Sequence, residues 1–210
     1  MGEKFIVFDL DGTISDPKDG IVRSINFALN TFGYEPRSED KLTKYIGPPL
    51  DKTFEELVAS TDQELIRSLV TRYRERYAQV GFSENTLYPG IRESLETIAN
   101  RYPLAICTSK RVDFAEKILA LFDLSHLFQV VNGADIGISK SQQLERLLAE
   151  GTIGADSIMV GDRNVDMIGA RDNRLLSVGV LWGYGDRDEL SHESPNIILQ
   201  HPDQLPEAIT

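Results

Sequence analysis

Pairs of aspartates follow two separate apolar runs of this chain. Asp9 and Asp11 come directly after the first run, and Asp162 and Asp166 come after a later one. Carboxylates this close repel each other unless a cation, a shared proton or a catalytic task compensates. Oxygen ligands of this kind suit Mg²⁺, which typically binds a few carboxylates together with waters and a substrate phosphate. The first pair alone is equally compatible with a simple acidic turn, because Asp11-Gly12 is a common turn sequence.

Four side chains have the types that phosphoryl transfer needs. The reaction requires an oxygen nucleophile, a proton donor for the leaving alcohol and groups that bind the transferred phosphate. Asp9 can attack phosphorus as a carboxylate, and Asp11 can protonate the leaving oxygen. Thr108 can hold the phosphate, and Lys140 can balance its charge. By contrast, the histidines lack zinc-ligand spacing, so we expect them at the surface: His126, His192 and His201.

Buried parallel strands must bring these residues together. Short apolar runs predict strands over residues 5–8, 104–107, 128–131, 157–160 and 176–180, with a shorter one over 197–199. Helical periodicity between these runs predicts repeated strand–helix units, which form a parallel sheet with helices on both faces. The carboxyl ends of parallel strands share one edge, where ligands bind. We therefore expect Asp9, Thr108 and Asp162 to converge.

The stretch between the first two predicted strands has a different character. Residues 15–88 predict one helix after another and no strand, with helices over 19–32, 38–45, 51–59 and 62–80. The first strand can join the sheet only if this stretch is an insertion. We therefore predict an α/β fold with a Rossmann-like parallel sheet core, formed by residues 1–14 and 89–210, and a small all-α domain over residues 15–88.

The composition limits the classes of partner. Asp and Glu number 33 against 22 Lys and Arg, a net charge of −11, which argues against nucleic acid because phosphate backbones need a basic surface. The sequence predicts no signal peptide and no membrane-spanning run, and its single cysteine, Cys107, lies in a predicted strand. These features predict a cytoplasmic protein with no membrane partner. The sequence leaves the oligomeric state open.

Together the motifs resemble those of the haloacid dehalogenase (HAD) superfamily. They are Asp9-Leu10-Asp11-Gly12-Thr13, the strand end at Thr108, Lys140 at a helix start, and Gly161-Asp162 with Asp166. Within that superfamily the chain is similar to the phosphoglycolate phosphatase-like group, in which a helical cap lies between the first and second motifs. Residues 15–88 match such a cap in position. The sequence Trp182-Gly183-Tyr184-Gly185 also resembles a C-terminal signature of that group.

The resemblance implies a role for each motif residue. Asp9 is the expected nucleophile, and Asp11 is the expected acid/base and, through its carbonyl oxygen, a metal ligand. Asp9 and Asp162 are expected to complete a Mg²⁺ site, with Asp166 behind them and Lys140 balancing charge. The residues expected to bind the substrate are Gly12, Thr13, Thr108 and Ser109. Lys110 competes for the lysine role, but Lys140 precedes a predicted helix and keeps the motif order.

The activity implied by this resemblance is Mg²⁺-dependent hydrolysis of a small-molecule phosphate monoester, of phosphoglycolate or nucleotide type, through an aspartyl-phosphate. Two alternatives stay open. A phosphomutase of the same fold would return the phosphoryl group to a substrate hydroxyl instead of water. A regulatory protein could bind phosphate without turnover. The residues that select the substrate are expected on the helical cap.

Overall fold

A computed structural model describes residues 2–47, 49–133 and 138–209 of the chain. Its contacts divide the chain into two compact units. One consists of Met1–Asp16 and Leu87–Thr210, and we call it the core unit. The other, Pro17–Thr86, is called the helical unit. The core unit is thus made of two stretches of sequence, and the helical unit is inserted between them.

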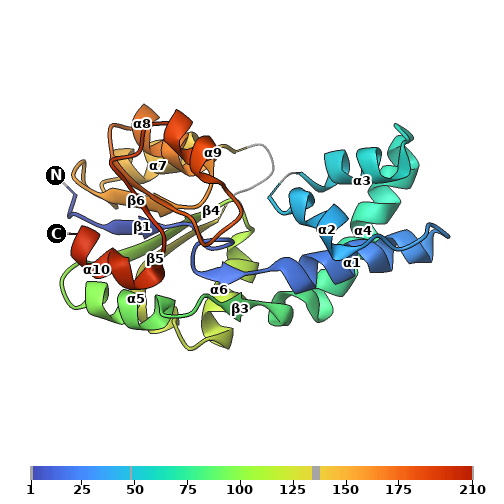
Figure 1. The fold of residues 1–210 in the computed structure, drawn as a ribbon, viewed down its shortest axis with the longest axis horizontal. Helices are drawn as coiled ribbons and strands as arrows, with labels where there is room; N and C mark the ends of the chain where they lie inside the picture. The colour runs from blue at the N-terminus through green and yellow to red at the C-terminus, as the bar shows by residue number, and fades with distance from the viewer. Residues whose placement is uncertain (1, 48, 134–137, 210) are drawn as a thin grey trace. The chain divides into compact units, whose positions relative to one another are not determined.

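A parallel sheet forms the centre of the core unit (Figure 1). Within the described residues it has six strands in the order β5-β4-β1-β6-β7-β8. Ile6 of β1 pairs with Leu104 on one side and with Ile158 on the other. The strands are β1 (Ile6–Phe8), β4 (Leu104–Thr108), β5 (Phe128–Gly133), β6 (Ile158–Gly161), β7 (Leu176–Val180) and β8 (Ile197–Leu199).

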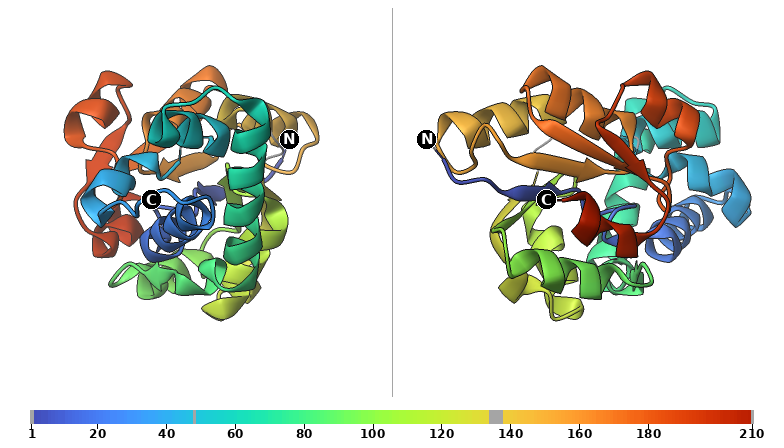
Figure 2. Two further views of the ribbon diagram at one scale, coloured as in Figure 1. Left: turned by 90° about the vertical axis from the view of Figure 1, so that its right-hand side faces the viewer. Right: turned by 60° about the vertical axis from the view of Figure 1, so that its left-hand side comes forward.

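Helices cover both faces of this sheet (Figures 1 and 2). The helices α7, α8 and α9 lie over one face, and α5, α6 and α10 lie over the other. Their bounds are α5 (Ile91–Ala99), α6 (Val112–Leu121), α7 (Lys140–Ala149), α8 (Asn164–Asp172), α9 (Arg187–His192) and α10 (Leu205–Ala208). Two 3-10 turns, η3 (Ser125–Leu127) and η4 (Pro202–Gln204), precede β5 and α10. This arrangement confirms the predicted α/β fold.

The apolar runs form strands because both of their sides are buried. Every residue of β1 and β4 is buried, as expected where helices cover both faces of a parallel sheet. On one face, Val7 of β1 and Met159 of β6 pack in a cluster with Leu144 of α7 and Ala170 of α8. Cys107 belongs to the same cluster, which confirms its predicted position in a packed strand.

The helical unit is built from α1 (Lys18–Thr31), α2 (Glu39–Leu42), α3 (Leu50–Val58) and α4 (Gln63–Gln79), with 3-10 turns η1 (Thr43–Tyr45) and η2 (Gly81–Glu84). The helices α1 and α4 pack together and bury Ile25 and Leu69. Gly20 allows the close approach of α1 to η2, because a Cβ atom there would lie 2.1 Å from the carbonyl oxygen of Gly81. The single helix predicted over residues 38–45 is divided into α2 and η1.

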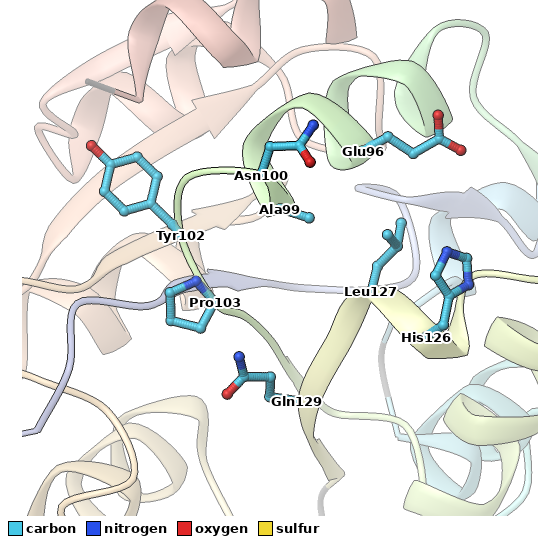
Figure 3. A pocket seen from close by; sticks show the side chains of 8 residues that line it. All are labelled: Glu96, Ala99, Asn100, Tyr102, Pro103, His126, Leu127 and Gln129. Carbon is cyan, nitrogen blue, oxygen red and sulfur yellow. The ribbon is translucent and has the colours of Figure 1, made fainter.

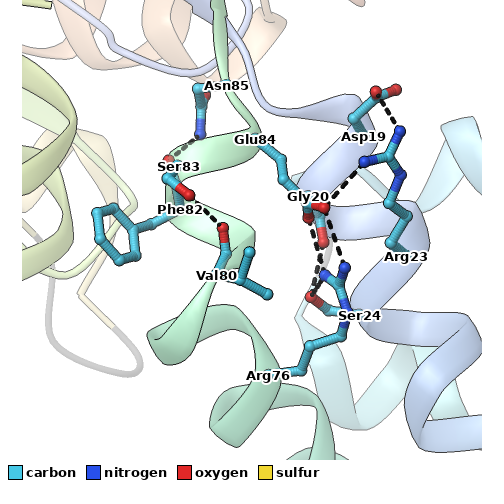
Figure 4. A network of polar contacts seen from close by, with 10 residues as sticks. All are labelled: Asp19, Gly20, Arg23, Ser24, Arg76, Val80, Phe82, Ser83, Glu84 and Asn85. Carbon is cyan, nitrogen blue, oxygen red and sulfur yellow. Dashed lines mark hydrogen bonds and ion pairs between the residues drawn. The ribbon is translucent and has the colours of Figure 1, made fainter. Parts of the chain in front are cut away.

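Polar side chains join α1, α4 and η2 in a network (Figure 4). The carboxylate of Glu84 accepts hydrogen bonds from Arg76 at 2.8 and 3.0 Å and from Arg23 at 2.9 Å. Arg76 also donates to the hydroxyl of Ser24 at 3.1 Å, and Ser24 donates to the carbonyl oxygen of Gly20 at 2.6 Å. The hydrogen bonds from Arg76, assisted by Arg23, hold the pKa of Glu84 below its usual range. These charged groups stabilise the packing of the helical unit itself.

Short strands mark the places where the chain leaves and re-enters the core unit. β2 (Ser15–Asp16) and β3 (Thr86–Leu87) pair with each other, and the N–H of Tyr88 donates to the carbonyl oxygen of Ile14 at 3.3 Å. Residues 15, 16, 87 and 88, predicted in the all-α domain, therefore group with the core unit. The prediction of no strand in this stretch was wrong, because a two-residue strand is too short to show periodicity.

A pocket of about 400 Å³ lies in the core unit beside the amino end of β4 (Figure 3). It is lined by Glu96, Tyr102 and His126 among others, and also by Pro103, the residue before β4. Thr108 lies at the opposite end of that strand. The pocket is therefore at the other edge of the sheet from the polar residues that follow the strands.

Two further sequence-based expectations concern the surface. The three histidines are exposed, as predicted: His126, His192 and His201. In the part of the chain that the structure describes, no helix combines the length and the apolar character needed to cross a membrane.

Candidate active site

Three strands of the core unit end at one edge of the sheet. Asp9 follows β1, Asp162 follows β6, and Thr108 is the last residue of β4. The N–H of Asp9 donates to the carbonyl oxygen of Val160 at 2.9 Å, which holds two of these strand ends side by side. The residues converge because β1 pairs in parallel with both of its neighbours.

Asp9, Asp162 and Asp166 form a buried carboxylate cluster. Each offers an oxygen, and these oxygens lie within 4.8 Å of one another. The Nζ atom of Lys140 lies 3.1 Å from Asp9 Oδ1 and 2.9 Å from Asp166 Oδ1, and it donates to the carbonyl oxygen of Cys107 at 2.6 Å. One ammonium group thus pairs with two of the three carboxylates, which leaves an excess of negative charge in a buried space.

Burial and mutual repulsion shift the pKa values of this cluster. Burial raises the pKa of Asp162 well above its usual range, and the charges of Asp166 and Asp9 add to that effect. Burial also raises the pKa of Asp166, to about 6, although the charge of Lys140 opposes the shift. Burial alone would lower the pKa of Lys140. The carboxylates of Asp166 and Asp9 raise the pKa by more than burial lowers it, so the lysine stays charged. A cation among the carboxylates would relieve the same repulsion.

The carboxylate of Asp162 is held by two loops that are far apart in sequence. Thr13 Oγ1 donates to Oδ1 at 3.3 Å, and the backbone N–H of Tyr184 donates to Oδ2 at 2.8 Å. Gly12 passes so close that a Cβ atom would lie 2.1 Å from Asp162 Oδ2. The φ angle of Gly12, 85°, also lies in the left-handed region that favours glycine. A side chain at this position would displace the carboxylate.

Asp11 lies beside the cluster and pairs with a second lysine. Its Oδ2 is 2.7 Å from the Nζ atom of Lys110, whereas its buried Oδ1 accepts no hydrogen bond from any residue that the structure describes. Burial raises the pKa of Asp11, and Lys110 opposes that shift. A carboxyl group with a raised pKa holds its proton more readily, as a general acid requires.

The remaining predicted residues occupy different environments. Thr108 and Thr13 are buried, and Thr108 Oγ1 accepts a hydrogen bond from the N–H of Lys110 at 3.2 Å. Ser109 is exposed. Asp166 was expected behind the metal ligands, and its carboxylate lies in the cluster itself.

The donor set of the carboxylate cluster fits a divalent cation. Its three carboxylate oxygens are ligands that a hard ion such as Mg²⁺ prefers. Lys140 alone leaves their negative charge unbalanced, and Asp11 Oδ1 adds a buried oxygen without a hydrogen-bond partner among the described residues. Charge, atom type and burial therefore show that these residues could hold a metal ion.

Two contacts of the site could not be obtained from sequence spacing. Lys110 was considered only as a competitor of Lys140, yet each lysine pairs with a different aspartate. Tyr184 was recognised as part of a signature but was given no contact with Asp162. The alternation of aromatic residues and glycines over residues 182–185 was the available signal, because glycines allow a loop to approach other backbone closely.

The chain is similar to known proteins along most of its length. Residues 6–180 match the family described as haloacid dehalogenase-like hydrolase. A 5'-nucleotidase from Pseudomonas aeruginosa is 36% identical over 195 residues, covering 90% of this chain and 88% of the relative. A phosphoglycolate phosphatase from Agrobacterium fabrum is 31% identical over 204 residues, covering 92% and 86%. A crystal structure of a Clostridium difficile protein has a TM-score of 0.91 at 36% identity and covers 100% of both chains. This chain therefore belongs to the haloacid dehalogenase-like hydrolase family.

Proposed function

We propose that this chain is a Mg²⁺-dependent phosphatase that hydrolyses a small-molecule phosphate monoester through an aspartyl-phosphate on Asp9. The observation that carries the proposal is the buried cluster of Asp9, Asp162 and Asp166, two of which pair with Lys140. The names of two relatives, a 5'-nucleotidase and a phosphoglycolate phosphatase, support a nucleotide or phosphoglycolate as the type of substrate.

Asp9, Asp162 and the carbonyl oxygen of Asp11 are the proposed Mg²⁺ ligands. When bound, the ion supplies positive charge that neutralises the carboxylates and orients the phosphate. Asp166 supports the site indirectly, because its carboxylate pairs with Lys140 and accepts a hydrogen bond from the N–H of Arg163 at 3.1 Å.

Asp9 is the proposed nucleophile of the first step. Its Oδ1 is held by Lys140 and by the N–H of Leu10, which donates at 2.8 Å, so we assign Oδ2 as the attacking atom. This oxygen forms a bond to phosphorus while the bond from phosphorus to the alcohol oxygen breaks. Asp11 gives its proton to that leaving oxygen. The raised pKa of Asp11 supports this role.

Asp11 acts as the base of the second step. It accepts a proton from a water molecule that attacks the phosphorus of the aspartyl-phosphate, and the bond from phosphorus to Asp9 breaks to release inorganic phosphate. We further propose that hydroxyl and backbone groups of the first two motifs bind the phosphate. These residues are Gly12, Thr13, Thr108 and Ser109. The first two follow β1, and the other two lie at the end of the neighbouring strand β4.

The helical unit is the proposed cap that selects the substrate and excludes bulk water. The connecting segments 15–18 and 88–90 would act as its hinges. If so, a variant that lacks the helical unit but still folds should lose rate and substrate selectivity. Equal rates in that variant would contradict a cap function.

Release of phosphate from p-nitrophenyl phosphate tests the proposed activity directly. We expect Mg²⁺-dependent release that EDTA abolishes and added Mg²⁺ restores. A panel containing phosphoglycolate, nucleoside monophosphates and sugar phosphates then identifies the substrate. Absence of phosphate release from the whole panel in the presence of Mg²⁺ would contradict the proposal. Transfer of the phosphoryl group to a second substrate hydroxyl, without release, would favour a phosphomutase.

A further inference from the structure

The loop of residues 182–185, between β7 and α9, has no part in the proposed reaction, yet it lies against the segments that form the site. The indole Nε1 of Trp182 donates to the carbonyl oxygen of Thr13 at 2.9 Å. A Cβ atom at Gly183 would lie 2.3 Å from the carbonyl oxygen of Gly12. The loop therefore has little freedom to move independently of the turn that follows Asp9.

Tyr184 contacts the carboxylate cluster through its backbone and the connecting segments through its side chain. Its N–H donates to Asp162 Oδ2 at 2.8 Å. Its hydroxyl donates to Asp16 Oδ1, and its phenol interacts electrostatically with that of Tyr88. All four residues belong to the core unit.

Asp16 and Tyr88 lie on the two segments that connect the units. Asp16 is the last residue of the core unit before the helical unit begins, and Tyr88 follows β3 after the chain returns. One phenol group thus interacts with both connecting segments, although these are separated by seventy residues of sequence, the whole of Pro17–Thr86. The same residue holds a carboxylate of the cluster through its N–H.

We propose that Tyr184 is a positioning residue that ties the conformation of both connecting segments to the orientation of the Asp162 carboxylate. A shift of Asp16 or Tyr88 moves the phenol, and the tightly packed loop transmits that shift to the N–H on Asp162. The inference rests on the proposed function, since it takes Asp162 as a Mg²⁺ ligand. Groups that orient metal ligands typically change metal affinity or activity by about 10- to 100-fold when they are removed.

Direct Mg²⁺ binding to the full chain, measured by titration calorimetry without substrate, tests this coupling. Tyr184→Phe removes the hydroxyl and keeps the N–H on Asp162, so we expect about tenfold weaker Mg²⁺ binding, at the low end of that range. Asp16→Asn should weaken Mg²⁺ binding in the same direction. The double variant should be no weaker than the stronger single effect, because Tyr184→Phe removes the same hydrogen bond that Asp16→Asn weakens by making its acceptor neutral.

Tyr102→Phe is the matched control. It removes a hydroxyl from the same unit, at the pocket beside the amino end of β4, and should leave Mg²⁺ binding unchanged. Circular dichroism and thermal unfolding establish that each variant is folded at the temperature of the titration. If Tyr184→Phe does not fold, Mg²⁺ affinity is measured in Asp16→Asn and Tyr88→Phe, singly and together. Affinity within twofold of wild type in these variants would then overturn the coupling.

Mg²⁺ affinity within twofold of wild type in folded Tyr184→Phe would overturn the coupling. Additive effects of Tyr184→Phe and Asp16→Asn would overturn it as well, because independent residues add. These outcomes leave the proposed function intact when the wild-type chain binds Mg²⁺ and releases phosphate. A wild-type chain that binds no Mg²⁺ would overturn both proposals.

Discussion

The core unit and the helical unit use charged residues in opposite ways. In the core unit, one lysine that is 3% exposed pairs with two of three clustered carboxylates, and the negative charge is not balanced. In the helical unit, the carboxylate of Glu84 is paired with two guanidinium groups, from Arg23 and Arg76. An ion pair with its partners in place has no need of a further cation, whereas a buried cluster with excess charge does. Burial combined with charge imbalance therefore marks the candidate site.

Substitution of the proposed nucleophile should lower kcat more than any other change, whereas a matched substitution in the helical unit should not lower it. Asp9→Asn keeps the shape of the side chain but removes the carboxylate that attacks phosphorus, so we expect kcat for p-nitrophenyl phosphate to fall by at least about 10³-fold. Asp40→Asn, at an exposed position of the helical unit, is the control and should keep full activity. Activity within tenfold of wild type in Asp9→Asn would rule out the aspartyl-phosphate.

Removal of the buried ammonium should affect both activity and stability. Lys140→Met leaves the carboxylates of Asp9 and Asp166 without their ion pair, so we expect about 3 kcal/mol lower free energy of unfolding. We also expect about a hundredfold lower kcat, since the group that holds the nucleophile is lost. Urea unfolding and steady-state kinetics measure the two effects. Lys41→Met, at an exposed position in the helical unit, should change neither.

Mg²⁺ binding should weaken at acidic pH, because protons compete with the metal for the same carboxylates. The pKa of Asp166 is raised to about 6, and that of Asp162 is raised well above its usual range. Lowering the pH through 6 therefore protonates Asp166, which pairs with Lys140 beside the proposed ligands, and the raised pKa of Asp162, a proposed ligand, acts in the same direction. We expect about fivefold weaker Mg²⁺ binding at pH 5.5 than at pH 7.5 by calorimetry. Affinity that is equal at the two pH values would show that neither carboxylate contributes to the metal site.

The ion pairs of the helical unit should matter for stability and not for metal binding. Glu84→Gln weakens the hydrogen bonds from Arg76 and Arg23, so we expect about 1–2 kcal/mol lower free energy of unfolding in urea. Mg²⁺ affinity should stay within twofold of wild type. A large loss of Mg²⁺ affinity in this variant would show that the charged residues of the helical unit also contribute to metal binding, which contradicts the comparison of the two units.

The fold was largely predictable because its strands and helices carry clear local patterns. Apolar runs with polar ends correctly predicted the strands of the sheet, and alternation with helices correctly predicted parallel pairing. The errors lie where an element is very short. Neither Ser15–Asp16 nor Thr86–Leu87 can show a period, and their pairing joins residues that are distant in sequence.

The candidate site was predictable to the extent that parallel strands bring their carboxyl ends together. This rule is enough to place Asp9, Thr108 and Asp162 at one edge. It does not say which lysine meets which aspartate, because Lys110 and Lys140 both follow strands of the same sheet. Only side-chain geometry pairs Lys140 with Asp9 and Lys110 with Asp11.

The sequence by itself determined the parallel sheet, the inserted helices and the acidic residues at the strand ends, because hydrophobic periodicity and the alternation of strands with helices are properties of local sequence. Tertiary structure alone decided which aspartate each lysine pairs with and that Tyr184 connects Asp162 with Asp16. Those contacts join loops separated by more than a hundred residues, or depend on the direction of one side chain. Their formation depends on how the whole core unit packs, which no local pattern records.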